Sequence, residues 1–205
     1  MKRLAILGAS GHGKVVADIA ERLGCSEIRF FDDRWPGHER NGVWSVVGDT
    51  AALIATASRH DGVVVAIGDN AARLARLRDL QRAGIEPVVL CHPSASRSPH
   101  TVVGAGSVLM AGAVVNVDSR LGEAVIINTG ATVDHDCQLG DAVHLSPGAH
   151  LAGNVHVGAG SWIGIGAVVR QGVRIGSRVM VGAGAVVLND VPDDSTVIGV
   201  PARAR

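Results

Sequence analysis

The second half of the chain repeats every six residues, and this period constrains the fold more than any other feature of the sequence. An aliphatic residue returns at every sixth position without a gap, at Val103, Leu109, Val115, Leu121, Ile127, Val133, Leu139, Leu145, Leu151, Val157, Ile163, Val169, Ile175, Val181 and Val187. The residue four places after each is small or β-branched: Ser107, Ala113, Ser119, Val125, Ala131, Cys137, Val143, Ala149, Val155, Ser161, Ala167, Val173, Val179, Ala185 and Val191. Such hexads are typical of short strands wound into a coil of triangular cross-section, three hexads per turn, with both kinds of position facing inward. The fifteen hexads therefore predict five coils, with glycine at corners such as Gly104 and Gly106.

Composition argues against several classes of function. The formal net charge is zero and the pI is about 7.1, so no bulk field attracts nucleic acid or an anionic membrane. The aromatic fraction of 2% offers little for stacking on single-stranded nucleic acid. The apolar run at residues 4–7 is too short for a signal peptide, and no run approaches transmembrane length. We therefore expect a cytoplasmic protein, with no nucleic-acid or membrane partner and with its three cysteines reduced.

The first half alternates short apolar runs with stretches of helical period. Strands are predicted at residues 4–7, 28–31, 63–67 and 88–90, and helices at 14–23, 50–57 and 71–83. Gly24 and Gly84 fall where helix C-caps belong. This alternation predicts right-handed βαβ units and a small Rossmann-like parallel sheet, with a binding edge at the carboxyl ends of its strands. The predicted fold class is α/β plus β-solenoid, with one domain over residues 1–93 and a second over 94–205.

A glycine-rich turn, Gly8-Ala9-Ser10-Gly11-His12-Gly13-Lys14, separates the first predicted strand from the first predicted helix. Backbone N–H groups and the positive end of a helix dipole at such a turn favour an anion, usually phosphate. The spacing matches a P-loop, but Val15 stands where a hydroxyl must hold magnesium, so nucleotide hydrolysis is discounted. The pattern G-x-G-x-x-G is absent as well. The turn predicts a nucleotide-phosphate site, and a tight turn with only a structural role is the alternative.

Two further segments are predicted to reach the same edge of the sheet. Asp32 and Asp33 close the second strand, where an acidic side chain can accept hydrogen bonds from a nucleoside. For Asp33 a solvated turn is the alternative. After the third strand, Gly68 permits close approach of a ligand, and Asn70 either faces that ligand or caps the next helix.

One segment of the repeat sets a histidine between two carboxylates, at Asp134, His135 and Asp136. Because His135 follows the inward Val133 by two places, its ring is expected to point outward. A carboxylate beside an imidazole fixes its tautomer, which favours a general base, whereas a plain surface histidine is the alternative. Residues eighteen apart stack on consecutive coils, so His135 is expected over Gly153 and His144 over Trp162. The bare glycine would leave room for a thioester beside the base.

Motifs along nearly the whole chain resemble the sugar O-acyltransferase family of sialic-acid O-acetyltransferases and sugar-nucleotide N-acetyltransferases. The pattern is most similar to that of the PglD-type nucleotide-4-amino-sugar N-acetyltransferases. The motifs are Ser-Gly-His at 10–12, Asp32-Asp33, Gly68 with Asn70, residues 134–137, His-Leu-Ser-Pro-Gly at 144–148, Gly153-Asn154 and Gly-Val-Pro-Ala at 199–202. The resemblance implies a left-handed parallel β-helix and acetyl-CoA-dependent N-acetylation of a UDP- or GDP-linked amino sugar, in surface polysaccharide biosynthesis.

The resemblance also implies the role of each candidate residue. His135 is the base and Asp136 orients it, although both acidic neighbours stand where relatives often carry Glu, which leaves the choice between Asp134 and Asp136 open. The residues implied at acetyl-CoA are His144, Gly153, Ile165 and Ala183. Those implied at the nucleotide sugar are Ser10, Gly11, His12, Asp32, Asp33, Gly68 and Asn70.

Three other functions are weighed against N-acetylation. O-acetylation of a sialic acid would use the same histidine, and a non-catalytic nucleotide-sugar sensor would use only the first domain. A γ-carbonic-anhydrase-like metal enzyme would need three histidines around zinc. His144, His150 and His156 step by six and so lie on three different faces, and no two histidines are five apart, as that class requires. We expect no metal site.

The spacing of two histidines bears on assembly. Nine residues separate His135 from His144, which is half of an eighteen-residue coil, so the two side chains are expected on opposite sides of the prism. If both serve one acetyl transfer, the site must form between subunits. A cyclic homotrimer would give every subunit both sides.

Overall fold

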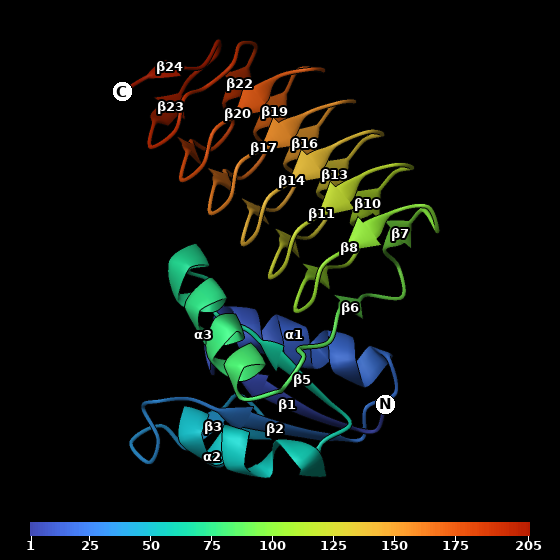
Figure 1. The fold of residues 1–205 in the computed structure, drawn as a ribbon, viewed down its shortest axis with the longest axis vertical. Helices are drawn as coiled ribbons and strands as arrows, with labels where there is room; N and C mark the ends of the chain where they lie inside the picture. The colour runs from blue at the N-terminus through green and yellow to red at the C-terminus, as the bar shows by residue number, and fades with distance from the viewer. The chain divides into compact units, whose positions relative to one another are not determined.

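The computed structural model describes all residues, Met1–Arg205, and divides into two compact units, Met1–Pro93 and Ser94–Arg205 (Figure 1). Each unit is built on its own core. No helix in either one is both long and apolar enough to cross a bilayer.

The first unit is a three-stranded parallel sheet with helices packed against it. The strand order is β2 (Glu27–Phe31), β1 (Arg3–Leu7), β5 (Gly62–Val65). The helices are α1 (Gly11–Arg22), α2 (Thr50–Thr56), the 3₁₀ turn η1 (Ala57–Arg59) and α3 (Asn70–Arg82). A short antiparallel hairpin of β3 (Arg40–Asn41) and β4 (Trp44–Ser45), which the sequence patterns did not predict, follows β2. Because β1 pairs with both neighbours in parallel, the turns that follow β1, β2 and β5 meet at one edge.

Three of the four predicted strands and all three predicted helices of this unit are confirmed within a few residues. Gly24 and Gly84 follow the ends of α1 and α3 with φ of +86° and +76°, the left-handed conformation that favours glycine at this position. The strand predicted at residues 88–90 is wrong. Val88 donates one backbone hydrogen bond to Val63, but Pro87 has no N–H for a ladder, and the short strand β6 begins only at Leu90 (Leu90–Cys91).

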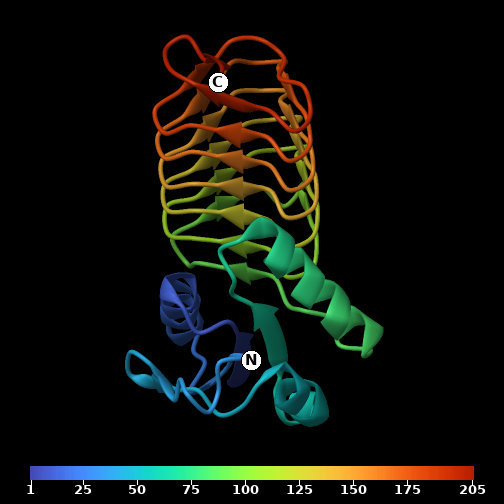
Figure 2. The ribbon, with the colours of Figure 1, turned by 90° about the vertical axis from the view of Figure 1, so that its left-hand side faces the viewer.

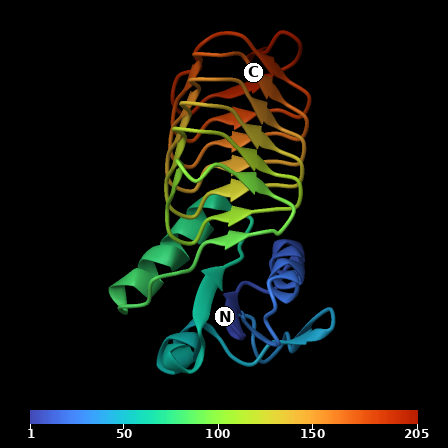
Figure 3. The same ribbon diagram turned by 90° about the vertical axis from the view of Figure 1, so that its right-hand side faces the viewer.

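The second unit is a parallel β-solenoid of stacked coils (Figures 2 and 3). The β13 face contains β7 (Ser96–Arg97), β10 (Val114–Val115), β13 (Thr132–Val133), β16 (His150–Leu151), β19 (Val168–Val169) and β22 (Val186–Val187). The β14 face contains β8 (Val102–Val103), β11 (Arg120–Leu121), β14 (Gln138–Leu139), β17 (His156–Val157) and β20 (Arg174–Ile175). The β15 face contains β9 (Val108–Leu109), β12 (Ile126–Ile127), β15 (His144–Leu145), β18 (Trp162–Ile163), β21 (Met180–Val181) and β23 (Thr196–Ile198), with β24 (Arg203–Ala204) antiparallel to β23.

The inward positions are those that the period predicts. From Leu109 to Val187 every aliphatic position is buried, and so is every small position from Ser107 to Val191. The polar residues among them are satisfied by the neighbouring coil. Ser119 Oγ accepts the N–H of Cys137 at 3.1 Å and donates to the Asp134 carbonyl at 2.7 Å. A hydroxyl therefore fits in this core because it completes the backbone hydrogen bonding at a corner.

The prediction of five coils is too short at both ends. The β13 face has six strands, because the solenoid begins at Ser96, where Arg97 occupies the register position below Val115. The Arg97 side chain bonds Thr101 at the open end of the coil instead of filling the core. At the other end Val197 pairs with Val181, sixteen residues back, so the last coil breaks the period that a count in sixes detects.

Candidate active site

His135 lies at the corner between β13 and β14, with its side chain 56% exposed. Its Nδ1 is 2.7 Å from Asp136 Oδ2. A carboxylate only accepts, so Nδ1 carries the proton of the neutral ring and Nε2 presents a lone pair. The hydrogen bond to Asp136, with the charges of both flanking aspartates, raises the pKa of His135. The site therefore has the chemistry of a general base that works near neutral pH.

The two aspartates beside His135 have different partners. Asp136 has φ of +60° and turns its carboxylate to the ring. Asp134 Oδ1 accepts the backbone N–H of His135 and the Nδ2 of Asn116, both at 2.9 Å, and these bonds lower the pKa of Asp134. Asp136 thus contacts the imidazole, whereas Asp134 holds the backbone. Asn116, which the motif search missed, precedes Asp134 by eighteen residues and could have been found from the coil register.

Gly153 lies directly against the His135 ring, one coil further along the chain. A Cβ built on Gly153 would be 2.6 Å from both Cε1 and Nε2 of His135, and the Asn154 N–H donates to the His135 carbonyl at 2.8 Å. The expected stacking of His135 on Gly153 is confirmed. Because residue 153 has no side chain, the imidazole ring can lie against its backbone, and the ring remains exposed to a reactant from solvent.

His144 lies on β15 and is 7% exposed. Its ring stacks on Trp162 with centroids 4.3 Å apart, which confirms the expected pairing with that residue. Asn128 Nδ2 lies 3.1 Å from His144 Nε2, and Asn128 Oδ1 accepts the N–H of Thr129. With the amide fixed in this way, Nε2 accepts and the proton of a neutral His144 is on Nδ1.

The residues implied at acetyl-CoA fall into two groups. His144, Ile165 and Ala183 lie on the β15 face and the corner after it, with Ile165 61% exposed and bonded to the coil of Ala183 through Gly184. Gly153 instead lies with His135 at the corner after β16. Within one chain the β14 strand separates His135 from His144. A groove of about 780 Å³ runs along the β14 face, and neither His135 nor His144 lines it.

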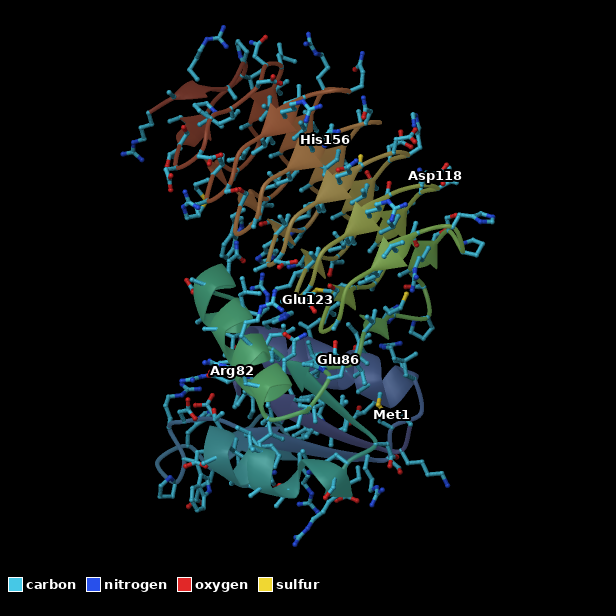
Figure 4. All side chains as sticks on the ribbon, viewed as in Figure 1. Met1, Arg82, Glu86, Asp118, Glu123 and His156 are labelled. Carbon is cyan, nitrogen blue, oxygen red and sulfur yellow. The ribbon has the colours of Figure 1, made fainter.

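The histidines considered as metal ligands do not converge. His144, His150 and His156 lie on strands of three separate sheets, as the steps of six predict, and Figure 4 places His156 on the outside of the solenoid. No group of three or more His, Cys, Asp or Glu side chains in the chain could hold a metal ion.

In the first unit, a pocket of about 280 Å³ lies at the carboxyl ends of the strands. Its lining comes from the glycine-rich turn, the end of β2 and α3: Leu7, Gly8, Ala9, Ser10, Asp32, Asp33, Arg34, Ile67 and Arg76. Gly8 has φ of +109°, and a Cβ there would be 2.7 Å from the Ala66 carbonyl, so only glycine fits. Of the predicted acceptor residues, Ser10, Asp32 and Asp33 line this pocket, while Gly11, His12, Gly68 and Asn70 lie outside its lining.

Both aspartates of this pocket already have partners. Asp32 accepts the Ala9 N–H at 2.8 Å and a bidentate ion pair from Arg34, and these bonds hold its pKa well below the ordinary value. Asp33 accepts from Thr50 and from Arg76 Nη2 at 2.9 Å, which also lowers its pKa. Asp32 therefore shapes the glycine-rich turn. The guanidinium of Arg34, missed by the sequence patterns, also donates to the Ala9 carbonyl at 2.9 Å.

Asn70 is buried beside this edge, and His12 is half-buried there. Burial, together with the charge of Arg73, lowers the pKa of His12 to about 4. Its Nε2 is buried without a hydrogen-bond partner. The proposed capping role of Asn70 is wrong, because Asp69 is the N-cap of α3 and accepts the Ala72 N–H at 2.8 Å. Asn70 Oδ1 accepts from Arg73 instead.

A small Rossmann-like unit joined to a hexapeptide β-helix that carries an exposed His–Asp pair defines a β-helical acyltransferase. Residues 3–80 match the model of the PglD N-terminal domain, and residues 154–189 match that of the bacterial transferase hexapeptide (six repeats). The chain is similar over its full length to the acetyltransferase domain of PglB from Neisseria gonorrhoeae FA1090, solved with acetyl coenzyme A (46% identity, 100% of both chains, TM-score 0.95). It is also similar to PerB from Caulobacter crescentus, solved with CoA and GDP-perosamine (41% identity, 100% of this chain and 98% of that chain, TM-score 0.94).

A curated relative is the UDP-N-acetylbacillosamine N-acetyltransferase of Bacillus subtilis (strain 168), 38% identical over 114 residues. That match covers 54% of this chain and spans about half, 52%, of the relative's length. The chain belongs to the PglD-type family of hexapeptide-repeat acetyltransferases, and its fold is a small α/β domain followed by a left-handed parallel β-helix.

Proposed function

We propose that the protein transfers the acetyl group of acetyl-CoA to the amine of a nucleotide-linked amino sugar. The observation that carries the proposal is the exposed His135, with Nδ1 on Asp136 and its Nε2 side over the bare Gly153. The relatives support the chemistry, because one was solved with acetyl coenzyme A and another with CoA and GDP-perosamine. We further propose a 4-amino-deoxy sugar on UDP or GDP as acceptor, a cytoplasmic location and a place in surface polysaccharide synthesis.

The reaction needs no covalent enzyme intermediate. The neutral amine attacks the thioester carbonyl while His135 Nε2 accepts its proton, and Asp136 stabilises the resulting imidazolium. Collapse of the tetrahedral adduct breaks the C–S bond. The leaving thiolate recovers a proton, which gives an amide and free CoA.

The two domains divide the substrates in this proposal. Residues 1–93 bind the nucleotide sugar through Ser10, Gly11, His12, Asp32 and Asp33, with Gly68 and Asn70 on the adjoining turn. Residues 94–205 bind acetyl-CoA through His144, Gly153, Ile165 and Ala183. The roles of Asp32 and Asp33 are indirect in part, since Asp32 accepts the Ala9 N–H of the glycine-rich turn and Asp33 accepts from Thr50 and Arg76.

A mass-spectrometric screen tests the proposal. Purified protein and acetyl-CoA are incubated with 4-amino and 3-amino sugars linked to UDP or GDP, with sialic acid and the corresponding hydroxyl sugars as controls. A mass gain of one acetyl group on an amino sugar is the expected result. Acetylation of the hydroxyl acceptors alone would assign an O-acetyltransferase, and turnover of none would contradict the proposal.

We also propose that the working protein is a homotrimer with its sites between subunits. His135 is at the corner between the β13 and β14 faces, whereas His144 is on the β15 face, so a single chain offers them in different directions. Mixing inactive His135→Ala and His144→Ala chains should restore activity, because about a quarter of interfaces in random trimers combine both intact residues. Mixed trimers verified by mass spectrometry that stay inactive would contradict the shared site.

A further inference from the structure

Arg73, in the first turns of α3, is completely buried. Its Nη1 donates to the carbonyls of Ile67 and Gly68 at 3.0 and 2.9 Å, and its Nη2 donates to Asn70 Oδ1 at 2.8 Å. A buried charge is costly unless such acceptors surround it. Burial lowers the pKa of Arg73 only to about 10, so the guanidinium stays charged at neutral pH.

Two of these acceptors, Ile67 and Gly68, belong to the turn that follows β5, and the third, Asn70, begins α3 at the same edge of the sheet, where the acceptor pocket lies. The same turn packs against the glycine-rich turn, since a Cβ on Gly8 would be 2.8 Å from Ile67 Cγ1. A movement of Ile67 therefore displaces the wall of the pocket. Arg73 is not part of the pocket lining, so its effect on a ligand there is transmitted through the turn.

The charge of Arg73 also acts on His12. Burial is the main cause of the lowered His12 pKa, and the positive charge of Arg73 lowers it further. The negative charge of Asp69, at the α3 N-cap, raises the pKa of Arg73. A protonated His12 would place two positive charges together in a buried region. His12 is therefore a neutral ring, able to donate one hydrogen bond and accept one.

We propose that Arg73 is a positioning residue of the acceptor site, which holds the turn at residues 67–70 against the glycine-rich turn and keeps its positive charge beside His12. The proposal rests on the proposed function, because it assigns this edge to the acceptor. It adds a residue that acts on the substrate only through its neighbours.

The test compares Arg73→Lys and Arg73→Met with Arg82→Met. Arg82 is on the same helix, 76% exposed and paired with Asp79, and serves as the matched control (Figure 4). Arg73→Met should raise the acceptor KM about tenfold to a hundredfold, the effect of losing charge-assisted hydrogen bonds, and leave the acetyl-CoA KM unchanged. Arg73→Lys keeps the charge but cannot span three acceptors, so its acceptor KM should rise less.

The pH profile separates positioning from general damage. In Arg73→Met the His12 pKa should rise above about 4 by the part that the charge of Arg73 contributes, while burial, the larger cause, remains; the acceptor KM should therefore begin to climb at a higher pH than in the wild type. Arg73→Lys and Arg82→Met should show no such climb. The double variant Arg73→Met with His12→Asn should lack this rise of the acceptor KM at low pH, because it has no His12 to protonate.

NMR titration of ¹⁵N-labelled histidine gives a readout independent of acetyl transfer. A rise of the His12 pKa in Arg73→Met, and none in Arg82→Met, is expected even if no sugar in the screen is acetylated, which separates failure of this inference from failure of the proposed function. An unchanged His12 pKa in folded Arg73→Met would overturn the inference. If Arg73→Met does not fold, the Arg73→Lys variant decides. Equal increases in its acceptor KM and its acetyl-CoA KM would overturn the inference.

Discussion

The two units of this chain place one histidine each, His135 and His12, in opposite electrostatic environments. His135 is exposed and lies beside carboxylates that raise its pKa, whereas His12 is half-buried with its Nε2 enclosed, and desolvation and the charge of Arg73 lower its pKa. The first environment produces a base that gains a proton readily, and the second a neutral hydrogen-bonding group. The difference supports the proposed division, in which proton transfer takes place on the solenoid and the acceptor binds to the α/β unit.

The largest effect should follow from removing the base. His135→Ala should lower kcat by about 10²- to 10⁴-fold, the usual contribution of a positioned general base, with little change in acetyl-CoA affinity. Steady-state kinetics and acetyl-CoA titration measure both. His156→Ala, an outward histidine one coil further on, is the matched control and should keep wild-type turnover. Equal activity of the two variants would end the assignment of His135.

A methyl group on Gly153 should displace the same base without unfolding the coil. Its Cβ would be 2.6 Å from the His135 ring, which is exposed and can swing aside. Gly153→Ala should therefore lower kcat about 10- to 100-fold by misplacing the imidazole, with an almost unchanged melting temperature. In Gly140→Ala the new Cβ would be 2.6 Å from the backbone nitrogen of Ala159, so that variant should lose stability. Loss of stability in both would contradict the expectation that only the exposed His135 ring has to move when residue 153 gains a methyl group.

The two units also differ in how far their sequence predicts them. In the solenoid the neighbour of each residue is eighteen positions away, so Gly153 under His135 and Trp162 under His144 followed from arithmetic. The period did not predict the two ends of the solenoid, where Arg97 replaces an aliphatic residue and the last coil shortens from eighteen to sixteen residues. A period identifies only the positions that obey it.

In the α/β unit the elements were predictable but their side-chain partners were not. Arg34 and His38 both donate to the Ala9 carbonyl, and Asn41 donates to Ser10, from a segment with no repeat. Such contacts depend on how turns distant in sequence converge. Sequence patterns therefore marked Asp32 as a ligand for nucleoside, and the structure adds that it bonds the Ala9 N–H.

Asp32→Asn tests the contribution of Asp32 to the glycine-rich turn and should have a smaller effect on activity than the changes at His135 and Gly153. An amide cannot accept the bidentate pair from Arg34, so the acceptor KM should rise about tenfold and the first unit should lose about 1–3 kcal/mol. Because the pKa of Asp32 is depressed in the folded protein, its stabilisation is fully present above about pH 4, the ordinary pKa, and is lost gradually as the pH falls through the lower folded-state pKa. The difference in thermal stability between wild type and variant should thus be largest at pH 7 and shrink progressively as the pH is lowered from about 4 towards 2. The exposed Asp18→Asn is the control, and a pH-independent difference would contradict the sign.

The smallest expected effect is a shift of the pH–rate profile, which distinguishes the roles of the two carboxylates beside His135. The base is active when neutral, so the rate should fall as the pH drops through its raised pKa. In Asp136→Asn the new residue tolerates φ of +60°, but the negative charge of the carboxylate bonded to His135 Nδ1 is lost. The His135 pKa should therefore fall, and the acidic limb of the pH–rate profile should move to lower pH. The shift should be small, because the ring is exposed to solvent and Asp134 remains charged. Asp134→Asn should move the limb less, since Asp134 binds the backbone N–H and Asn116 rather than the ring. A larger shift in Asp134→Asn than in Asp136→Asn would make Asp134 the carboxylate that governs the base.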